Sequence, residues 1–414
     1  MRMPIHHWRK RIRLIILMMV LFSFAMFQGG FVSWFLFYTI LPFCLYTFLL
    51  SFYSAKKWNV TAELNSTVVQ AGDAVGVVVY FHRPFPFPIP YLVVEQQVSK
   101  SLYRYDEGNK KYTQLANDFV VAERKLKRMI YPGFKKRFSL RLELDKLPRG
   151  EHKLESVIFT YGDPFGYLEK RFEVTLDQKL TVLPRIHQLK LRLAPSYQEE
   201  GIFGMVEHEA KKTNTVASVR EYVAGDRFSW IDWKTTARKN TMMTKEFEQE
   251  KELDTTCILD LSGDESRSQL SMEASIDFAV SLLQFVHRKQ QQTNFLLFGE
   301  HVKRFSYEQI QYHFDSVVHY LAKLENKPIA FSQQRPLWIQ NQTCIWILTH
   351  LTKQKAMKIN KWKRTVPNLI VFYISPEEVI QKNQYWNDLQ VNGVRVFTIT
   401  EKELSQLNWE VDKR

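Results

Sequence analysis

Two long apolar runs without a charged residue stand at the start of the chain. They cover residues 14–27 and 31–53, and a Gln-Gly-Gly break separates them. A helix needs about 20 apolar residues to cross a bilayer, and the second run has that length. Interfacial side chains and arginine stems before the first run extend it toward the same length. The pattern therefore predicts a transmembrane helical hairpin within residues 1–57, with helices at about 12–28 and 31–53.

Basic residues stand at the two open ends of this hairpin and not at its connector. The connector carries none, whereas the two ends carry Arg2, Arg9, Lys10, Arg11, Arg13, Lys56 and Lys57. The positive-inside rule places such ends in the cytoplasm, so we expect a multi-pass protein of the cell membrane whose soluble domains face the cytoplasm. A cleaved signal peptide is the alternative, because a basic segment and a short apolar stretch ending in "SFA" also fit one. The second full-length run argues against it.

Short alternating or β-branched runs follow over residues 58–188. They include "VGVVVYF", "YLVVEQQV", "RFSLRLEL", "RFEVTL" and "KLTVL", and turn signals such as "RPFPFPIP", "YPG" and "YGDPFG" separate them. Several strands at this spacing predict an all-β sandwich of immunoglobulin-like architecture, a module that typically binds or spaces.

The pattern changes again over residues 253–414. Continuous apolar runs such as "TTCILD", "CIWILTH" and "NLIVFYIS" alternate with helical patterns, of which residues 269–290 and 307–324 are the longest. Strands that are buried on both faces and alternate with helices indicate a doubly wound α/β domain.

The loop after the first of these strands carries candidate metal ligands. Asp260, Ser262 and Asp264 lie two residues apart, so their oxygens could face one hard cation such as Mg²⁺. The alternative is a polar strand end that caps the following helix. A complete site needs a ligand from another loop, and there His350 follows Thr349 where a carboxylate would be expected.

Composition excludes several classes of protein. The formal net charge is +14, but many basic residues flank the hairpin, so we attribute the excess to the membrane surface and expect no nucleic-acid partner. The three cysteines have no CxxC spacing, which argues against a disulfide framework or a thiolate zinc site. A GxxxxGK[ST] loop does not occur, so the chain itself is not expected to be a nucleotide-hydrolysing motor of that class.

A connecting segment, residues 189–252, contains the most unusual stretch of the chain. "GDRFSWIDWKTTARKN", residues 225–240, combines tryptophans, carboxylates and basic side chains. Ser229 is predicted to cap a short helix that places Trp230 and Trp233 on one apolar face.

Four interpretations of its charged residues compete. A metal-dependent phosphodiesterase or nuclease would use Asp226 with the Asp232-x-Lys234 pair, but five intervening residues are too few for two paired strands. Two carboxylates could act as the acid and base of a glycosidase, and basic and aromatic residues could bind nucleic acid. We favour a polar network of Asp226, Asp232, Lys234 and Arg238 that packs one domain on another or docks a partner, with tryptophans as anchors.

"VREYVAGDRFSWIDWKTTARKNTMMTKEFEQE", residues 219–250, resembles the signature of the bacterial domain of unknown function 58 family. "RGEHKLESVIFTYGDPFGYL", residues 149–168, resembles the stretch that precedes it, with Tyr167 where leucine is usual. The positions that match the signature are Arg220, Tyr222, Gly225, Asp226, Asp232, Trp233, Lys234 and Arg238.

The resemblance implies a fold and a partner. It implies that residues 253–414 are similar to von Willebrand factor A domains, whose Asp-x-Ser-x-Ser loop holds magnesium; Asp260 and Ser262 match that loop, and Asp264 replaces the third residue. Family members are typically associated with MoxR-type AAA+ ATPases in protein maturation or envelope-related processes. We therefore expect a bacterial, membrane-anchored adaptor without enzymatic activity, and the metal-dependent phosphodiesterase is the alternative.

Overall fold

The computed structural model describes residues 6–124, 126–192, 216–223, 226, 228–247, 255–263, 268–288, 292–299, 301–325, 343–366, 368–406 and 408–412. It divides into two compact units. The first comprises Met1–Gly108, Phe119–Pro184 and Leu321–Glu325, and the second comprises Asn109–Asp118, Arg185–Tyr320 and Asn326–Arg414. Residues 109–118 lie within the predicted β-module in sequence but belong to the second unit.

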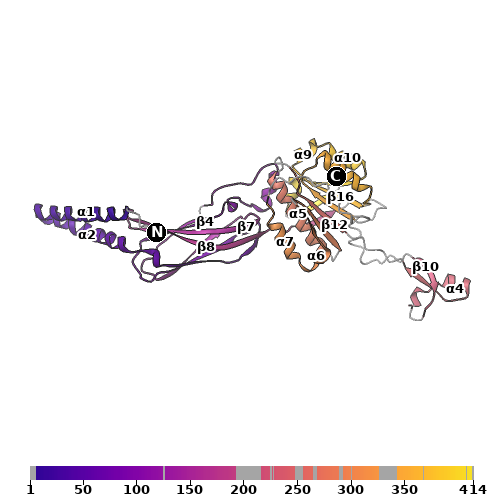
Figure 1. Ribbon diagram of the computed structural model, residues 1–414, viewed down its shortest axis with the longest axis horizontal. Coiled ribbons are helices and arrows are strands. Elements are labelled where there is room, and N and C mark those ends of the chain that lie inside the picture. The colour runs from indigo at the N-terminus through magenta and orange to yellow at the C-terminus, as the bar shows by residue number, and fades with distance from the viewer. Residues whose placement is uncertain are drawn as a thin grey trace. The chain divides into compact units, whose positions relative to one another are not determined.

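The first unit begins with a helical hairpin formed by α1 (His6–Gln28) and α2 (Phe31–Phe52), drawn in indigo in Figure 1. Both helices are long and apolar enough to cross a membrane, over Trp8–Gln28 and Phe31–Phe52. Gly29 and Gly30 form the turn with φ of +52° and +116°, a region that other residues rarely adopt. The predicted pair of apolar helices is confirmed.

The β-module of the same unit consists of two sheets that share one apolar core. One sheet has the order β1-β3-β6 (Asn59–Leu64, Val75–His82, Arg137–Leu144). The other has the order β2-β8-β7-β4-β5 (Val68–Gln70, Glu169–Leu183, Gly150–Gly162, Tyr91–Val98, Leu126–Ile130). Val79 and Phe81 of the first sheet lie in the same buried cluster as Val94 and Phe159 of the second. Alternating apolar residues thus meet between the sheets, as the sequence pattern indicates.

One predicted strand boundary in the β-module is wrong. The runs "RFEVTL" and "KLTVL" form the single strand β8, which pairs with β7 along its whole length. The register shifts where Leu154 pairs with Gln178 and Ser156 pairs with Thr175, so β8 has an additional residue there. Such a bulge accommodates the break in the apolar pattern without ending the strand.

Basic side chains join the C-terminal end of α2 to the β-module and to α1. The Lys170 ammonium, on β8, donates hydrogen bonds to the carbonyl oxygens of Leu50, Ser51 and Tyr53 at 3.2, 2.8 and 2.5 Å. The Arg11 guanidinium from α1 donates to the Ser51 carbonyl at 2.6 Å. These carbonyls end a helix, where a positive charge is favourable.

The second unit is built on a six-stranded sheet of order β14-β13-β12-β15-β16-β17. The strands are β12 (Thr255–Asp260), β13 (Thr293–Phe298), β14 (Val302–Phe305), β15 (Thr343–Leu348), β16 (Asn368–Ile374) and β17 (Arg395–Ile399). All neighbours are parallel except β14, which pairs antiparallel with β13. The strand order reverses between β12 and β15, where ligands bind in folds of this kind.

Helices cover both faces of this sheet, as predicted for a doubly wound domain (Figure 1). Phe278 of α5 (Gln269–Arg288) contacts Phe372 of β16, with ring centroids 5.0 Å apart. The neighbouring Val371 faces the opposite core, which contains Trp362 of α8 (Lys353–Lys363). The shorter helices are α9 (Glu377–Lys382), α10 (Tyr385–Val391) and α11 (Glu401–Leu404).

The predicted helix over residues 307–324 is divided in two. The capping box of Ser306 and Gln309 begins α6 (Tyr307–Tyr312), and α7 (Phe314–Ala322) follows. His313 separates them with φ −134° and ψ 40°, outside the helical region. The sequence has no glycine or proline at this position, so the break has no local signal.

Candidate functional site

The signature segment forms a small two-stranded sheet with two short helices within the second unit, which we call the signature module (described residues within 216–247). Strands β10 (Val216–Glu221) and β11 (Met243–Phe247) pair antiparallel, and the short helices η5 (Phe228–Trp230) and α4 (Trp233–Lys239) lie between them in sequence. Ile231, Met243 and Thr244 are its buried residues. Gly225 lies outside the described residues.

Asp226 is bound by Arg220 from β10. The guanidinium donates to both carboxylate oxygens, at 2.8 and 2.9 Å, and the Val223 backbone N–H donates to Oδ2 at 3.0 Å. These hydrogen bonds, that of Arg220 foremost, hold the pKa of Asp226 below its usual range. The pair closes the loop after β10, and the Arg220 side chain remains 41% exposed.

Asp232 has a different and local role. Its Oδ1 accepts the backbone N–H groups of Lys234 and Thr235 at 3.0 and 3.1 Å, so it caps the N-terminus of α4. The hydrogen bond from Thr235 is the main cause that lowers the pKa of Asp232. The predicted cap at Ser229 is wrong, because Ser229 lies inside η5 and the helix begins later than expected.

The two carboxylates of the signature therefore take part in two separate local interactions. Asp226 is paired with Arg220, and Asp232 is occupied by its own helix, whereas the Lys234 and Arg238 side chains are exposed. The start of α4 also differs from the adjacent paired strands that the nuclease interpretation requires, since Asp232 and Lys234 lie at a helix terminus.

Apolar side chains of the signature module are unusually exposed. Phe228 is 69% exposed, Trp233 64% and Val223 61%. The Tyr222 ring lies 6.2 Å from that of Phe228. Trp230 belongs to η5 and not to α4, so the two tryptophans do not form the predicted stripe along one helix.

Two of the predicted ligands, Asp260 and Ser262, lie together at the carboxyl end of β12, and Lys355 lies beside them. The Asp260 carboxylate is fully buried, and its Oδ1 accepts hydrogen bonds from the backbone N–H of Ser262, at 2.9 Å, and from the Ser262 hydroxyl. Lys355 of α8 is 1% exposed, and its ammonium lies 3.4 Å from Asp260 Oδ2 and donates to the Ser262 carbonyl at 2.7 Å. Sequence analysis missed Lys355, which is far from this loop in the chain.

This arrangement does not fit a divalent cation. Mg²⁺ is bound by carboxylate and other oxygens whose charge is otherwise unneutralised. Here a buried ammonium already neutralises the Asp260 carboxylate. No group of three metal-ligating side chains of the His, Cys, Asp or Glu type occurs among the described residues, and Asp264 lies outside them. The expectation of a magnesium ion remains a prediction, and the geometry argues against it.

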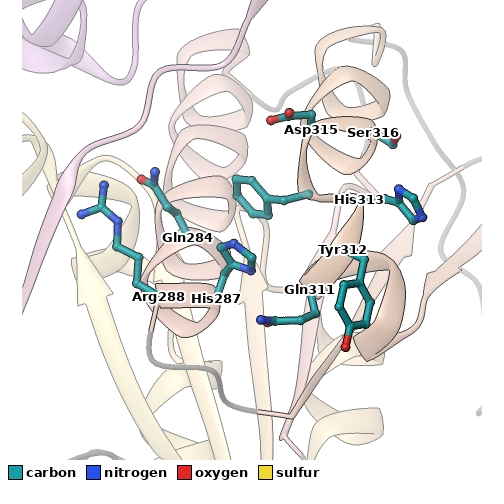
Figure 2. Close-up of a pocket in the computed structure, with 9 residues that line it drawn as sticks. Gln284, His287, Arg288, Gln311, Tyr312, His313, Asp315 and Ser316 are labelled. Carbon is teal, nitrogen blue, oxygen red and sulfur yellow. The ribbon is translucent and has the colours of Figure 1, made fainter.

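A pocket of about 660 Å³ lies between the C-terminal end of α5 and the turn between α6 and α7 (Figure 2). The His287 ring stacks on Phe314, with centroids 5.2 Å apart. The other lining residues include Arg288, Tyr312 and Asp315. The pocket contains none of the residues that the sequence analysis selected.

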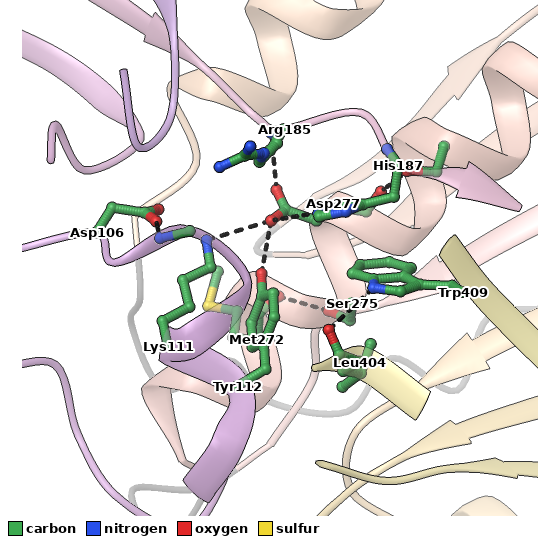
Figure 3. Close-up of polar contacts among 12 residues, drawn as sticks. Asp106, Lys111, Tyr112, Arg185, His187, Met272, Ser275, Asp277, Leu404 and Trp409 are labelled. Carbon is green, nitrogen blue, oxygen red and sulfur yellow. Dashed lines mark hydrogen bonds and ion pairs between the residues drawn. The ribbon is translucent and has the colours of Figure 1, made fainter. Parts of the chain in front are cut away.

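The second unit also contains a buried carboxylate that the sequence analysis missed (Figure 3). Asp277 of α5 accepts hydrogen bonds from the Tyr112 hydroxyl at 2.5 Å, the Lys111 ammonium at 3.2 Å and the Arg185 backbone N–H at 3.0 Å. The His187 ring stacks on Trp409 at 3.9 Å between centroids, beside the same carboxylate. One side chain thus connects α5 to two distant segments of its unit.

Charge pairing controls the ionisation of this carboxylate. Burial alone raises the pKa of Asp277, but the Lys111 charge and the groups around it outweigh burial and hold the pKa well below its usual range. A sequence signal existed, because Asp277 interrupts the apolar run "ASIDFAV" of an amphipathic helix. A charge on a buried helical face requires a partner, but the sequence does not identify that partner.

The fold and these sites define a class of protein that has two apolar N-terminal helices, a β-module, a small signature module and a parallel α/β sheet. Residues 218–338 match the family described as "Protein of unknown function DUF58". Over 273 residues the chain is 37% identical to the uncharacterized protein YeaD of Bacillus subtilis strain 168, covering 66% of this chain. The family match over residues 218–338 confirms the resemblance that the signature motif indicated. The alignment covers 65% of that relative, slightly less than two thirds of its length.

Two solved structures that are similar to parts of the chain have low TM-scores. The CARDB domain of a Pyrococcus furiosus protein, in complex with di-metal ions, has a TM-score of 0.18 and 11% identity, covering 30% of this chain and 93% of that one. Cwp6 from Clostridium difficile has a TM-score of 0.19 and 9% identity, covering 84% and 39%. At these scores the likeness carries no argument about this chain.

Replacing Lys355 by methionine tests the buried pair with Asp260. Removal of one partner leaves an uncompensated buried charge, so we expect the free energy of unfolding to fall by about 3–5 kcal/mol. Lys353→Met, on an exposed position of the same helix, should change it little. Thermal melting of the detergent-solubilised chain measures both. A saturable rise of the wild-type Tm with added Mg²⁺, lost in Asp260→Asn, would show that the site binds the metal after all.

Asp277→Asn should lower the free energy of unfolding at pH 7 by about 3–5 kcal/mol, because Lys111 then loses the charge that compensates its burial. The folded pKa of Asp277 is depressed, so its contribution is complete above about pH 4 and is lost as the pH falls through the folded pKa. The difference between wild type and variant should therefore shrink in acid. Denaturation at several pH values checks this, with the exposed Asp388→Asn as control; a constant difference would contradict it.

Proposed function

We propose that the protein is a membrane-anchored adaptor without enzymatic activity, held by α1 and α2, with both soluble units on the cytoplasmic side of a bacterial cell membrane. We further propose an immunoglobulin-like type for the β-module and a von Willebrand factor A-like type for the α/β unit. The hairpin supports the anchoring by its length and its apolar composition. Basic residues that flank the hairpin at its two ends support the proposed orientation.

The partner is proposed to be a MoxR-type AAA+ ATPase, which the family resemblance implies, and its binding site to be the signature module. The observation that carries this assignment is the exposure of Phe228 and Trp233 on a module whose strands form only a two-stranded sheet. A two-stranded sheet is marginally stable by itself, so such a module gains from a partner. Exposed aromatic residues are typical anchors of protein interfaces.

The exposed cations of α4 complement this surface. Lys234, Arg238 and Lys239 are exposed on a helix that also presents Trp233. A mixed apolar and positive surface suits a partner that offers a pocket with acidic residues around it. The phosphodiesterase alternative is less favoured, because Asp226 is engaged by Arg220 and Asp232 by the α4 N-terminus.

Co-purification tests the partner and the surface together. The tagged full-length chain is solubilised in detergent from its own cells, and AAA+ ATPases that co-purify are quantified by mass spectrometry. We expect a MoxR-type ATPase with the wild type and a loss of most of it with the Phe228→Ser, Trp233→Ser double variant. Tyr312→Ser is the matched control, since Tyr312 is 76% exposed outside the module. Equal recovery with both variants would reject this surface, and absence of the ATPase from the wild type would reject the partner.

A further inference from the structure

Three loops at the end of the β-module that contacts the hairpin share an unusual composition. They are residues 83–90, 131–136 and 163–168, which we call the hairpin-side loops; they follow β3, β5 and β7. Phe85 is 64% exposed, Tyr131 and Phe134 are each 71% exposed, and Phe165 is 68% exposed. No other aromatic side chain among the described residues of the β-module is more than 60% exposed. The most exposed aromatic side chains of the described β-module are therefore confined to these loops.

Buried charged side chains bind the backbones of these loops. Arg83 is fully buried and donates hydrogen bonds to the carbonyl oxygens of Lys135 at 2.9 Å, Phe87 at 3.0 Å and Gly133 at 3.1 Å, which joins two of the loops. Asp163 is also fully buried and accepts the backbone N–H of Phe165 at 3.1 Å in the third. The fold thus presents apolar rings to the outside on fixed backbones.

Contacts with α2 show the level at which the loops lie. The Phe165 ring lies 5.2 Å from that of Phe43, and the Tyr46 hydroxyl donates to the Pro88 carbonyl at 2.8 Å. Phe43 precedes the end of α2 at Phe52 by about 14 Å along the axis, at 1.5 Å per residue. The loops therefore lie beside the C-terminal half of the apolar helix and not beyond its end.

The charge of the loops has one sign on the surface. Lys135 and Lys136 are exposed and follow Phe134 directly. Of the strand residues that directly follow the loops, Arg137 on β6 and Glu169 on β8 are exposed as well. The only carboxylate within the three loops, Asp163, is fully buried. Aromatic rings with neighbouring basic residues are typical of segments that lie in the interface of an anionic membrane.

We propose that the hairpin-side loops are a lipid-binding surface: Phe85, Phe134 and Phe165 enter the headgroup region of the membrane that α2 crosses, and Lys135 and Lys136 bind anionic headgroups. This proposal rests on the membrane anchoring of the proposed function, but it concerns the β-module, to which the proposed function assigns no ligand. Burial of the aromatic rings at the interface compensates for their exposure in water. The β-module is then held against the membrane by its loops as well as by the hairpin.

Site-specific labelling tests the depth of the loops. Phe85→Cys, Phe134→Cys and Phe165→Cys variants of the full-length chain are labelled with the fluorophore NBD and reconstituted in nanodiscs; Cys44, Cys257 and Cys344 are buried, and labelling of the wild type controls for them. We expect a blue shift of the emission and quenching by doxyl-labelled lipids at all three positions. Val121→Cys is the matched control, because Val121 is 65% exposed at the opposite end of the β-module, and its emission should stay water-like.

Lipid composition tests the basic residues. With NBD at residue 134, adding phosphatidylglycerol to phosphatidylcholine discs should increase the blue shift, and Lys135→Gln with Lys136→Gln should abolish that increase. The exposed pair Lys153→Gln and Lys179→Gln, on β7 and β8, should leave it unchanged.

Two results would overturn the proposal and identify which part failed. Water-like emission at all four labelled positions, in discs that retain the protein, would reject the lipid surface and leave the anchoring intact. A chain that fails to enter discs would reject the anchoring itself, and the lipid surface with it.

Discussion

The second unit depends on the pairing of one buried carboxylate. Asp277 lies in the middle of α5, where burial opposes ionisation, and it is charged because Lys111 and Tyr112 approach it from one segment and the Arg185 backbone from another. The His187 backbone N–H also donates to Ser281 on the same helix at 2.9 Å. A buried charge is tolerated only when its partners are in place. The ionisation of Asp277 therefore requires these segments to be in place, and the charged carboxylate in turn holds them there.

Buried cations organise other parts of the chain in a similar way. Arg83 joins two hairpin-side loops, and Lys170 binds the C-terminal carbonyls of α2. Arg124 donates to the Arg104 and Lys146 carbonyls at 3.0 and 2.7 Å and so holds the long connection between β4 and β5. Guanidinium and ammonium groups satisfy several carbonyl oxygens at once, which suits irregular backbone. Part of the basic excess is thus structural, and the charge balance alone overstates the contribution of the membrane surface.

The pairing of charges differs between the carboxyl end of β12 and the signature module. At the carboxyl end of β12, the Lys355 ammonium supplies the positive charge beside the Asp260 carboxylate, and both groups are buried. This edge of the sheet is therefore stabilised by the chain's own side chains. In the signature module the ion pair and the helix cap are local, and the aromatic side chains stay exposed. The polar residues of the signature thus shape a small scaffold, and the apolar ones remain for contact with a partner.

Local pattern determined much of this protein. Length and hydropathy gave the two apolar helices, period-two alternation gave the β-strands, and continuous apolar runs gave the parallel strands, because each of these signals depends on neighbouring residues only. The interruption at His313 and the fused strand β8 were decided by pairing and packing, which local pattern does not encode. The partners of Asp260 and Asp277 were likewise beyond the sequence, since Lys355 and Lys111 lie far away along the chain. A charged residue in an apolar pattern indicates that a partner is required, because an unpaired buried charge is unfavourable. Only the tertiary structure determines which distant side chain lies close enough to be that partner.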